Sequence, residues 1–334
     1  MFRRGVNACV KVVRPISRFR CDPWVETYLI APNVSALTVF APAKINLFLA
    51  ITGRRPDGFH DLLSVVVPLQ FGDRLEIEPR DVRAYSLECD APGVPVDETN
   101  LVLRAAKLFS EATGIGKGSH FRLLKRVPAG AGLGGGSSDG TAALCGLNRL
   151  AGSPLDRGAL QSLAAQLGSD CALFLEGRPC VMRGRGEQIT PLDEDAAGRL
   201  SGRRILVFKP SFGISTAWAY GQMAQRPETY LRFSDAEARL NSWTRSPSAP
   251  AEEIMLNNME AVAFRKFRAL PALRDRLQKS FGLKVGMSGS GSACFSLLEE
   301  TTDLAPITAC IQDAWGADVF LIETRIGQNL VDPR

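Results

Sequence analysis

The glycine-rich segment 128–138, PAGAGLGGGSS, constrains the fold of this chain more than any other stretch. A backbone with so few side chains can direct successive N–H groups at one point, and a helix starting after it adds the positive end of its dipole. The basic, strand-like residues 121–127 precede it, and the Ala/Leu-rich residues 141–150 follow it. We therefore predict a phosphate-binding loop between a strand and a helix, formed by Pro128, Ala129, Gly130, Ala131, Gly132, Leu133, Gly134, Gly135, Gly136, Ser137 and Ser138.

The familiar phosphate-binding motifs do not account for this loop. A Walker A loop needs a Lys after its glycines, and none stands there; the pair Gly116-Lys117 is followed by Gly118 instead of Ser or Thr. A Rossmann fingerprint needs an acidic residue after the next strand, and none lies at that distance. A flexible linker is the remaining alternative, but linkers do not usually hold Leu133 between a basic strand and an Ala/Leu-rich helix.

The charge distribution argues against a nucleic-acid partner. The net charge is +5, and residues 1–36 carry six Lys or Arg against two acidic residues, which leaves the remainder nearly neutral. A domain that binds nucleic acid would instead show a basic stripe on its surface. We predict that residues 1–36 form a disordered basic extension. An organelle transit peptide is the alternative, but the segment is neither Ser-rich nor clearly amphipathic.

Cysteine spacing and hydropathy further limit the classes of protein to which this chain can belong. The eight cysteines are scattered, without a CxxC pair or a Cys/His cluster, so we expect no zinc-type site. Several stand in apolar strings, as reduced and buried cysteines do, which predicts a cytoplasmic protein. No apolar run reaches the ~18 residues of a membrane-spanning helix, so we expect no membrane partner.

The remaining pattern predicts an α+β fold in two units, because strands and helices do not alternate regularly. A polar stretch, 226–251, indicates a loop with a short helix. The expected helices run from 101 to a stop at Gly114, from a Ser153 capping box to 168, and over 255–267, 272–280 and 303–314. The expected strands are 37–41, 45–52, 62–71, 74–78 (after a Gly72-Asp73 turn), 205–209, 283–287, 294–298 and 319–323.

Two further segments place polar groups beside apolar strands. Lys44 and Asn46 interrupt an apolar strand pair, and because uncompensated burial is costly they must face solvent or line a polar cleft. A lysine facing phosphates would stabilise the charge that develops during transfer. A second glycine run between two strands is a hairpin turn or a partner of the first loop; it consists of Ser288, Gly289, Ser290 and Gly291.

Two more candidates are weaker when taken alone. Asp170 follows a helix end in the sequence Gly-Ser-Asp, where an ordinary turn carboxylate is common. Phe59 and His60 stand on a constrained loop, where the histidine could act as a general base or read the edge of a base. The alternative for this loop is a turn with surface charges.

Taken together, these segments resemble the GHMP kinase superfamily, whose three motifs occur here in order. They are the Pro-x-x-Lys-type strand, which here reads Pro42-Ala43-Lys44, the central glycine loop, and the C-terminal Gly-x-Gly loop. The stretch PAKINLFLAITGRRPDGFHDL (42–62), Gly-Ser-Asp at 168–170, Gly-Arg-Gly-Glu at 184–187 and Asn-Leu-Val at 100–102 are similar to the branch that acts on a cytidine diphosphate of methylerythritol. The resemblance covers about residues 37–325.

The resemblance implies a two-domain fold: a ribosomal-S5-domain-2-like, ATP-binding half at 37–200 and a ferredoxin-like half at 201–325, with a tail at 326–334. It implies ATP over the central loop and Mg²⁺ held through ATP, not by a protein cluster. Asp170 would be the catalytic base for a 2-hydroxyl and Lys44 its partner. Asn46, Phe59 and His60 would bind the cytidylyl substrate, in a monomer or a homodimer.

Two alternatives stay open: another small-alcohol kinase of homoserine or mevalonate type, or an inactive nucleotide-binding regulator. The loop 53–60 argues against the first, and retention of both Lys44 and Asp170 argues against the second. Four positions depart from the common pattern of the family, and they concern substrate affinity more than reaction type. They are Phe59 for Tyr, Ala172 for Pro, Gly140 for Ala, and Val181 where some members present a second aromatic ring.

Overall fold

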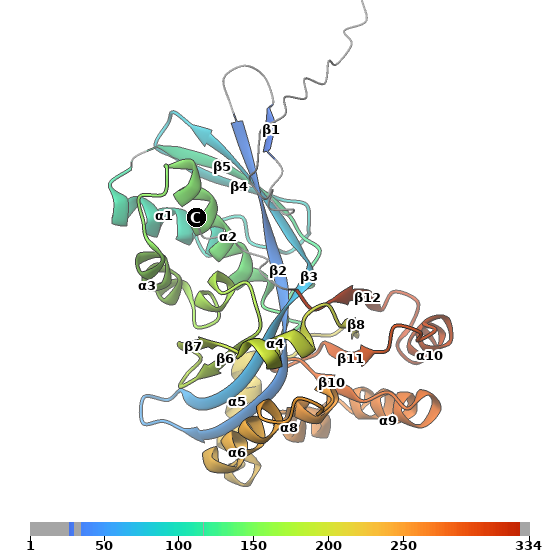
Figure 1. Ribbon diagram of the computed structural model, residues 1–334. Coiled ribbons are helices and arrows are strands. Elements are labelled where there is room, and N and C mark those ends of the chain that lie inside the picture. Colours follow the sequence, from blue (N-terminus) through green and yellow to red (C-terminus); the bar gives the residue numbers. More distant parts are fainter. Residues whose placement is uncertain (1–26, 30–34, 116, 328–334) are drawn as a thin grey trace, which may run out of the picture.

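The computed structural model describes residues 27–29, 35–115 and 117–327, and it shows two sheets with helices on their faces (Figure 1). Among these residues, the larger sheet has eight strands and the smaller sheet has four. Most strands of the larger sheet come from the N-terminal half, and all those of the smaller sheet come from the C-terminal half. The predicted α+β class is confirmed.

Two long antiparallel strands, β2 (Ser35–Arg54) and β3 (His60–Arg80), run through the molecule. We predicted a break in each strand, and both predictions are wrong. β-Bulges absorb the proline inside β2 without ending the strand. Gly72 lies so close to β2 that a Cβ there would be 2.2 Å from the Ala41 oxygen, and Asp73 accepts backbone N–H groups instead of turning the chain.

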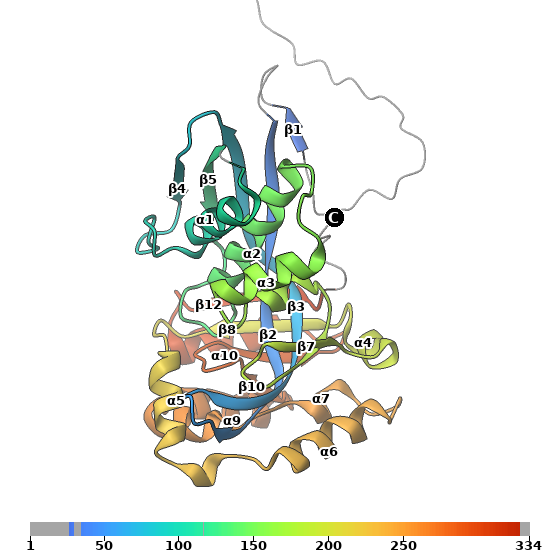
Figure 2. The same ribbon diagram turned by 90° about the vertical axis from the view of Figure 1, so that its left-hand side faces the viewer.

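The other strands of the larger sheet are short. The main order is β1-β2-β3-β5-β4, while β6 and β7 extend it beside β3 and β9 pairs with β2. Helices α1, α2 and α3 lie together on one face of this sheet (Figure 2). The bounds are β1 Thr27–Leu29, β4 Tyr85–Cys89, β5 Gly118–Leu124, β6 Cys180–Arg183, β7 Gln188–Pro191, β9 Leu256–Asn257, α1 Leu101–Thr113, α2 Gly135–Leu150, α3 Arg157–Leu167 and the 3₁₀ helix η1 Ala172–Leu175.

The helices of the N-terminal half begin and end at identifiable caps. Asn100 caps α1 and the left-handed Gly114 ends it, as predicted. Helix α2 begins at Gly135, inside the glycine run instead of after it. The predicted Ser153 cap is wrong, because Ser153 occupies a left-handed turn (φ 60°) after α2 and Asp156 caps α3 through its side chain.

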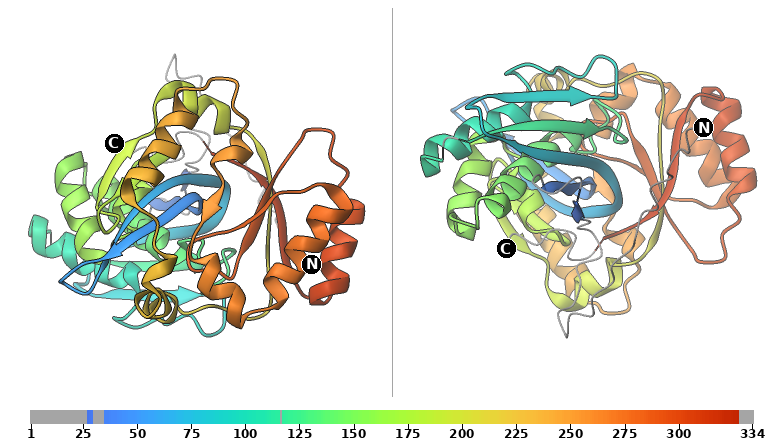
Figure 3. Two further views of the ribbon diagram at one scale, coloured as in Figure 1. Left: turned by 90° about the horizontal axis from the view of Figure 1, so that it is seen from below. Right: turned by 90° about the horizontal axis from the view of Figure 1, so that it is seen from above.

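The smaller sheet is antiparallel, in the order β10-β11-β8-β12. Helices α9 and α10 lie side by side against it, the orange and red helices at the right of Figure 3. This arrangement fits the expected ferredoxin-like half. The bounds are β8 Arg204–Lys209, β10 Val285–Met287, β11 Cys294–Leu298, β12 Phe320–Arg325, α4 Glu194–Leu200, α5 Thr216–Ala224, α6 Phe233–Thr244, α7 Ala251–Ile254, α8 Glu260–Lys266, α9 Ala269–Phe281, α10 Ala305–Trp315 and the 3₁₀ helix η2 Pro227–Thr229.

The structure refines one expectation in the C-terminal half and corrects another. The polar stretch 226–251, expected to be a loop with a short helix, contains the 12-residue helix α6, whose Ala236, Leu240 and Trp243 place one buried face on the core. The predicted helix 255–267 is divided into β9 and α8, because Leu256 and Asn257 extend the chain to pair with β2 before the helix starts.

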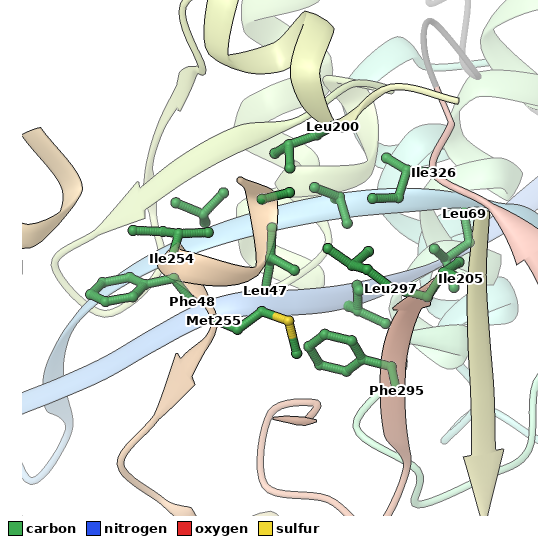
Figure 4. Packing of buried hydrophobic residues seen from close by; sticks show 14 of the residues in the cluster. Leu47, Phe48, Leu69, Leu200, Ile205, Ile254, Met255, Phe295, Leu297 and Ile326 are labelled. Atoms are coloured by element: carbon green, nitrogen blue, oxygen red, sulfur yellow. The ribbon is translucent and has the colours of Figure 1, made fainter. Parts of the chain in front are cut away.

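One hydrophobic cluster joins the two sheets (Figure 4). Leu47 and Phe48 of β2 pack in the same cluster as Ile205, Phe295 and Leu297 of the smaller sheet. Close packing of this kind resists displacement of one sheet against the other. The division into domains at 200 stays a prediction.

The two ends of the chain are only partly described. Most of the predicted extension 1–36 lies outside the described residues. Its residues 27–29 pair with β2, so the expectation of disorder is wrong at those positions. Ile326, the first residue of the predicted tail, is fully buried and bridges Leu69 of β3, while 328–334 lie outside the described residues.

Candidate active site

A cavity of about 600 Å³ lies where the two sheets meet. Its wall comes from both halves of the chain: β2, the central glycine loop, the turn before Asp170, the second glycine loop and α5. At the end of the predicted glycine loop, Ser137 lines the cavity, whereas Ser138 is buried. Most of the predicted site residues line this cavity.

The central loop bends through glycines with positive φ. Gly130, Gly132 and Gly134 have φ of 61°, 76° and 73°, values that favour glycine over residues with a Cβ. Gly134 is the N-cap of α2, so the helix N-terminus opens onto the cavity that the loop lines. Backbone N–H groups at such a terminus, together with the helix dipole, attract phosphate.

The second glycine loop packs directly on the first, an arrangement that sequence reasoning offered as one of two interpretations. The Ser288 hydroxyl donates to the Gly132 carbonyl at 2.9 Å, and the Ala293 N–H donates to the Ala131 carbonyl at 3.0 Å. Gly289 and Ser290 line the cavity. The two loops therefore form one continuous backbone wall.

Lys44, Asn46 and Asp170 meet in this cavity although they are far apart in sequence. The Lys44 ammonium donates to the Asn46 side-chain oxygen at 2.6 Å and lies 3.9 Å from the Asp170 carboxylate. Burial lowers the pKa of Lys44, and the Asp170 charge opposes that shift. Asn46 is itself fixed, since its amide donates to the Ser64 hydroxyl at 2.9 Å. The lysine head is therefore held in one position, while the Asp170 side chain remains 40% exposed to an incoming group.

Phe59 and His60 lie beyond the cavity wall, but their neighbours line it. Phe59 is 55% exposed, and the Arg185 guanidinium lies 4.8 Å from the centroid of its ring. The buried His60 ring packs 4.9 Å from Tyr220 and shares a 3.0 Å hydrogen bond with the Tyr230 hydroxyl. Burial, with a contribution from the charge of Arg54, lowers the pKa of His60, so its ring is neutral near pH 7.

Sequence reasoning missed Tyr220 and noted only that Val181 stands where some members of the family present a second aromatic ring. Val181 is buried in the core and is not among the residues that line the cavity, whereas Tyr220 of α5 lines the cavity next to His60. No motif in the sequence marked Tyr220, because it comes from a helix in the other half of the chain. Gly140, which stands where the family commonly has Ala, also has a structural reason, since a Cβ there would lie 3.0 Å from Leu101.

A buried charge network holds both ends of the central loop, and it was also missed. The Lys125 ammonium donates to Asp73 of β3 and, at 2.7 Å, to Asp139 of α2. Burial raises the pKa of Asp139 to about 8; Lys125 opposes this shift and the Asp73 charge adds to it. Asp73 also accepts from the Val127 N–H at 2.8 Å. Strand and helix are thus fixed on either side of the glycines.

We expect Asp139→Asn to flatten the pH dependence of stability. Because the folded pKa of Asp139 lies above the unfolded value, its stabilising contribution is complete below pH ~4 and is lost as the pH rises toward about 8. One such group changes the free energy of unfolding by up to about 1.4 kcal/mol per pH unit. Urea unfolding at pH 5, 6.5 and 8 measures this. Asp193→Asn, the same change at an exposed helix cap, is the control, and parallel curves for Asp139→Asn and the unaltered protein would contradict the assignment.

Among the described residues, no group of three or more His, Cys, Asp or Glu side chains could hold a metal ion. Ser137 and Asp170 both line the cavity and carry side-chain oxygens, the type of ligand that Mg²⁺ prefers. Within the described part of the chain, no helix is long and apolar enough to cross a membrane.

Fold and site together define a kinase of the GHMP class. Models described as "GHMP kinases N terminal domain" and "GHMP kinases C terminal" match residues 100–178 and 245–317. The chain belongs to the 4-diphosphocytidyl-2-C-methyl-D-erythritol kinase family. Relatives of that name come from Methylacidiphilum infernorum (40% identical over 265 residues, 78% of this chain and 86% of the relative) and Synechococcus elongatus (37% over 281 residues, 80% and 88%).

One solved structure agrees with this assignment, and a more distant one shares the fold. A crystal structure of 4-(cytidine 5′-diphospho)-2C-methyl-D-erythritol kinase has a TM-score of 0.69 at 37% identity and covers 87% of this chain and 99% of its own. Homoserine kinase from Cytophaga hutchinsonii has a TM-score of 0.68 at 17% identity, with coverage of 88% and 95%. The second likeness shows a shared fold alone.

Proposed function

We propose that this protein transfers the γ-phosphoryl group of ATP to the 2-hydroxyl of 4-(cytidine 5′-diphospho)-2-C-methyl-D-erythritol, a step in non-mevalonate isoprenoid synthesis. The observation that carries the proposal is the 3.9 Å approach of Lys44 and Asp170 inside the cavity that the central glycine loop lines. A base, a cation and a phosphate cradle are the parts that phosphoryl transfer needs.

In this proposal the substrate hydroxyl donates its proton to the Asp170 carboxylate as its oxygen bonds to the γ-phosphorus and the bond to ADP breaks. Asp170 is suited to this role because its side chain is exposed enough to meet the hydroxyl. Lys44 lies beside it and stabilises the negative charge that develops on the transferring oxygens. Mg²⁺, when bound with ATP, neutralises further charge on the phosphates.

The central loop takes the phosphates of ATP in this arrangement. Gly136 has open space around it, so its backbone can approach a phosphate closely. Ser288 supports the loop through the bond that its hydroxyl donates to the Gly132 carbonyl. In this proposal the cytidine end meets the segment of Phe59 and His60, where the His60 ring packs on Tyr220 and the Arg185 guanidinium lies over the Phe59 ring.

We expect Phe59→Ala to raise the KM for the cytidylyl substrate about tenfold, because stacking of one base on an aromatic ring contributes about 1–3 kcal/mol. The KM for ATP and the kcat should change less than about twofold, since Phe59 lies on a different loop from the nucleotide cradle. Phe59→Tyr keeps the ring and should keep the KM. A rise in the KM for ATP of similar size would show that Phe59 serves the nucleotide instead.

One assay tests the function as a whole. Purified protein is incubated with ATP, Mg²⁺ and the cytidylyl substrate, with homoserine and mevalonate as competing acceptors. We expect turnover of the cytidylyl compound alone. Turnover of homoserine or mevalonate would place the chain with the other small-alcohol kinases, and ATP binding without any transfer would favour the inactive regulator.

A further inference from the structure

We infer that Arg185 binds the diphosphate of the cytidylyl substrate, an assignment that rests on the proposed function. The substrate carries its cytosine at one end and its reacting hydroxyl at the other, with two phosphates between them. A side chain that recognises those phosphates must therefore lie between the cytidine pocket and Asp170. It must also present a positive charge that no carboxylate of the protein already neutralises.

Arg185 stands on a tight turn that is anchored to the larger sheet. The turn 184–187 joins β6 to β7, and its glycines 184 and 186 have φ of 67° and 107°. The Leu62 N–H of β3 donates to the Gly184 carbonyl at 2.8 Å, and the Glu187 carboxylate accepts from the Arg185 N–H. The backbone of Arg185 is therefore fixed, while its side chain is exposed and lines the cavity.

The turn is close to both segments that the proposed function assigns to the two ends of the substrate. On one side, the Arg185 guanidinium lies 4.8 Å from the centroid of the Phe59 ring. On the other side, a Cβ placed on Gly186 would lie 3.9 Å from the carbonyl oxygen of Ser169, the residue before Asp170. A molecule that reaches from the Phe59 ring to the Asp170 carboxylate must therefore pass Arg185.

The charge of Arg185 is available for a ligand. Three cationic side chains line the cavity: Lys44, Lys125 and Arg185. Lys44 has Asp170 within 4 Å, and Lys125 is bound by the buried side chains of Asp73 and Asp139. Within the described chain, Arg185 has no carboxylate at ion-pair distance from its side chain. Arg185 interacts electrostatically with Asp57, but the Asp57 carboxylate forms its ion pair with Arg55.

The chemistry of the side chain matches a diphosphate. A diphosphate diester carries two negative charges, and the guanidinium fork can donate two parallel N–H bonds to phosphate oxygens. The planar group can also remain stacked on an aromatic ring while its edge faces the phosphates. Lysine at this position would keep the charge but lose both features.

The test uses three probes that differ only in phosphate: cytidine, CMP and CDP. Calorimetry measures their dissociation constants for the unaltered protein, Arg185→Ala and Arg185→Met. We expect both variants to weaken CDP about tenfold and cytidine less than twofold, because a hydrogen bond to a charged group is worth about 1.5–3 kcal/mol and 1.4 kcal/mol is a factor of ten. The KM for the full substrate should rise in parallel, with kcat nearly unchanged.

Arg183→Ala is the matched control, since Arg183 stands two residues away on the same hairpin, pairs with Glu237 and is not among the residues that line the cavity. It should leave the ratio of CDP to cytidine affinity unchanged. Equal weakening of all three probes in the Arg185 variants, or no weakening, would overturn the inference. It would mean that Arg185 acts through Phe59 alone or not at all. If the unaltered protein binds none of the three probes, the proposed function fails as well.

Discussion

Asp170→Asn is expected to lower kcat by about 10²- to 10⁴-fold, the usual contribution of a positioned general base. The amide has nearly the shape of the carboxylate, so the substrate can still bind, but it cannot accept the hydroxyl proton at neutral pH. The Lys44 ammonium also loses the neighbouring charge that opposes the effect of burial, so the pKa of Lys44 falls further. Both changes act on the transfer step, and therefore the KM for ATP should stay within about threefold of its original value.

The variant should remain folded. The Asp170 side chain is 40% exposed and its 3.9 Å ion pair is long, so the pair contributes well under ~1 kcal/mol to stability. Steady-state kinetics at saturating ATP, together with thermal unfolding, separates lost chemistry from lost structure. Asp193→Asn makes the same chemical change at a helix cap outside the cavity and should keep full activity. An Asp170→Asn enzyme with near-normal kcat would require another base.

The parts of this site that the sequence could predict are those whose chemistry is visible in short segments. Glycines have no side chain to pack, so the run at 128–138 indicates a close approach of the backbone to a ligand or to another segment of the chain. Lys44 is conspicuous because a charge inside an apolar strand needs a partner. Asp170 is not conspicuous, because a carboxylate after a helix end is common, and only the family resemblance placed it beside Lys44.

The parts that could not be predicted depend on contacts between distant segments. Lys125 bonds to Asp73, 52 positions away, and to Asp139. Each is an ordinary charged residue in its own segment. Tyr220 reaches His60 from the far half of the chain. Such pairings are set by how sheets and helices meet in space, which local periodicity does not encode.

The fold shows the same division between local and distant causes. Helix α1 has its cap and its stop within its own segment, so its bounds were predictable from Asn100 and Gly114. The continuity of β2 and β3 was not, because proline and glycine are local signals for a break. Pairing along almost the whole length of both strands overrides those signals. The proline is absorbed by a bulge, and Gly72 is needed for close approach instead of a turn.

Gly132→Ala is expected to lower the free energy of unfolding by about 3 kcal/mol or more and to abolish most activity. A Cβ at this position would lie 2.1 Å from the Ser288 carbonyl oxygen, a backbone atom that cannot rotate away. The φ of 76° adds a cost of about 1–2 kcal/mol for any residue with a Cβ. Relief of the clash would separate the two glycine loops and break the 2.9 Å bond from the Ser288 hydroxyl to Gly132. The nucleotide cradle and the wall beside Asn46 would then shift together.

Gly136→Ala provides the matched comparison, four residues further along the same run. Nothing lies within 4 Å of a Cβ there, and Gly136 is inside helix α2, where alanine is favoured by about 1 kcal/mol. We expect this variant to unfold at an equal or higher denaturant concentration than the unaltered protein, while its KM for ATP rises because the methyl group occupies the space proposed for phosphate. Denaturant unfolding and ATP titration of both variants separate the two roles of glycine in this loop. If Gly132→Ala were as stable as Gly136→Ala, the close packing of the two glycine loops could not be what holds the cradle in place.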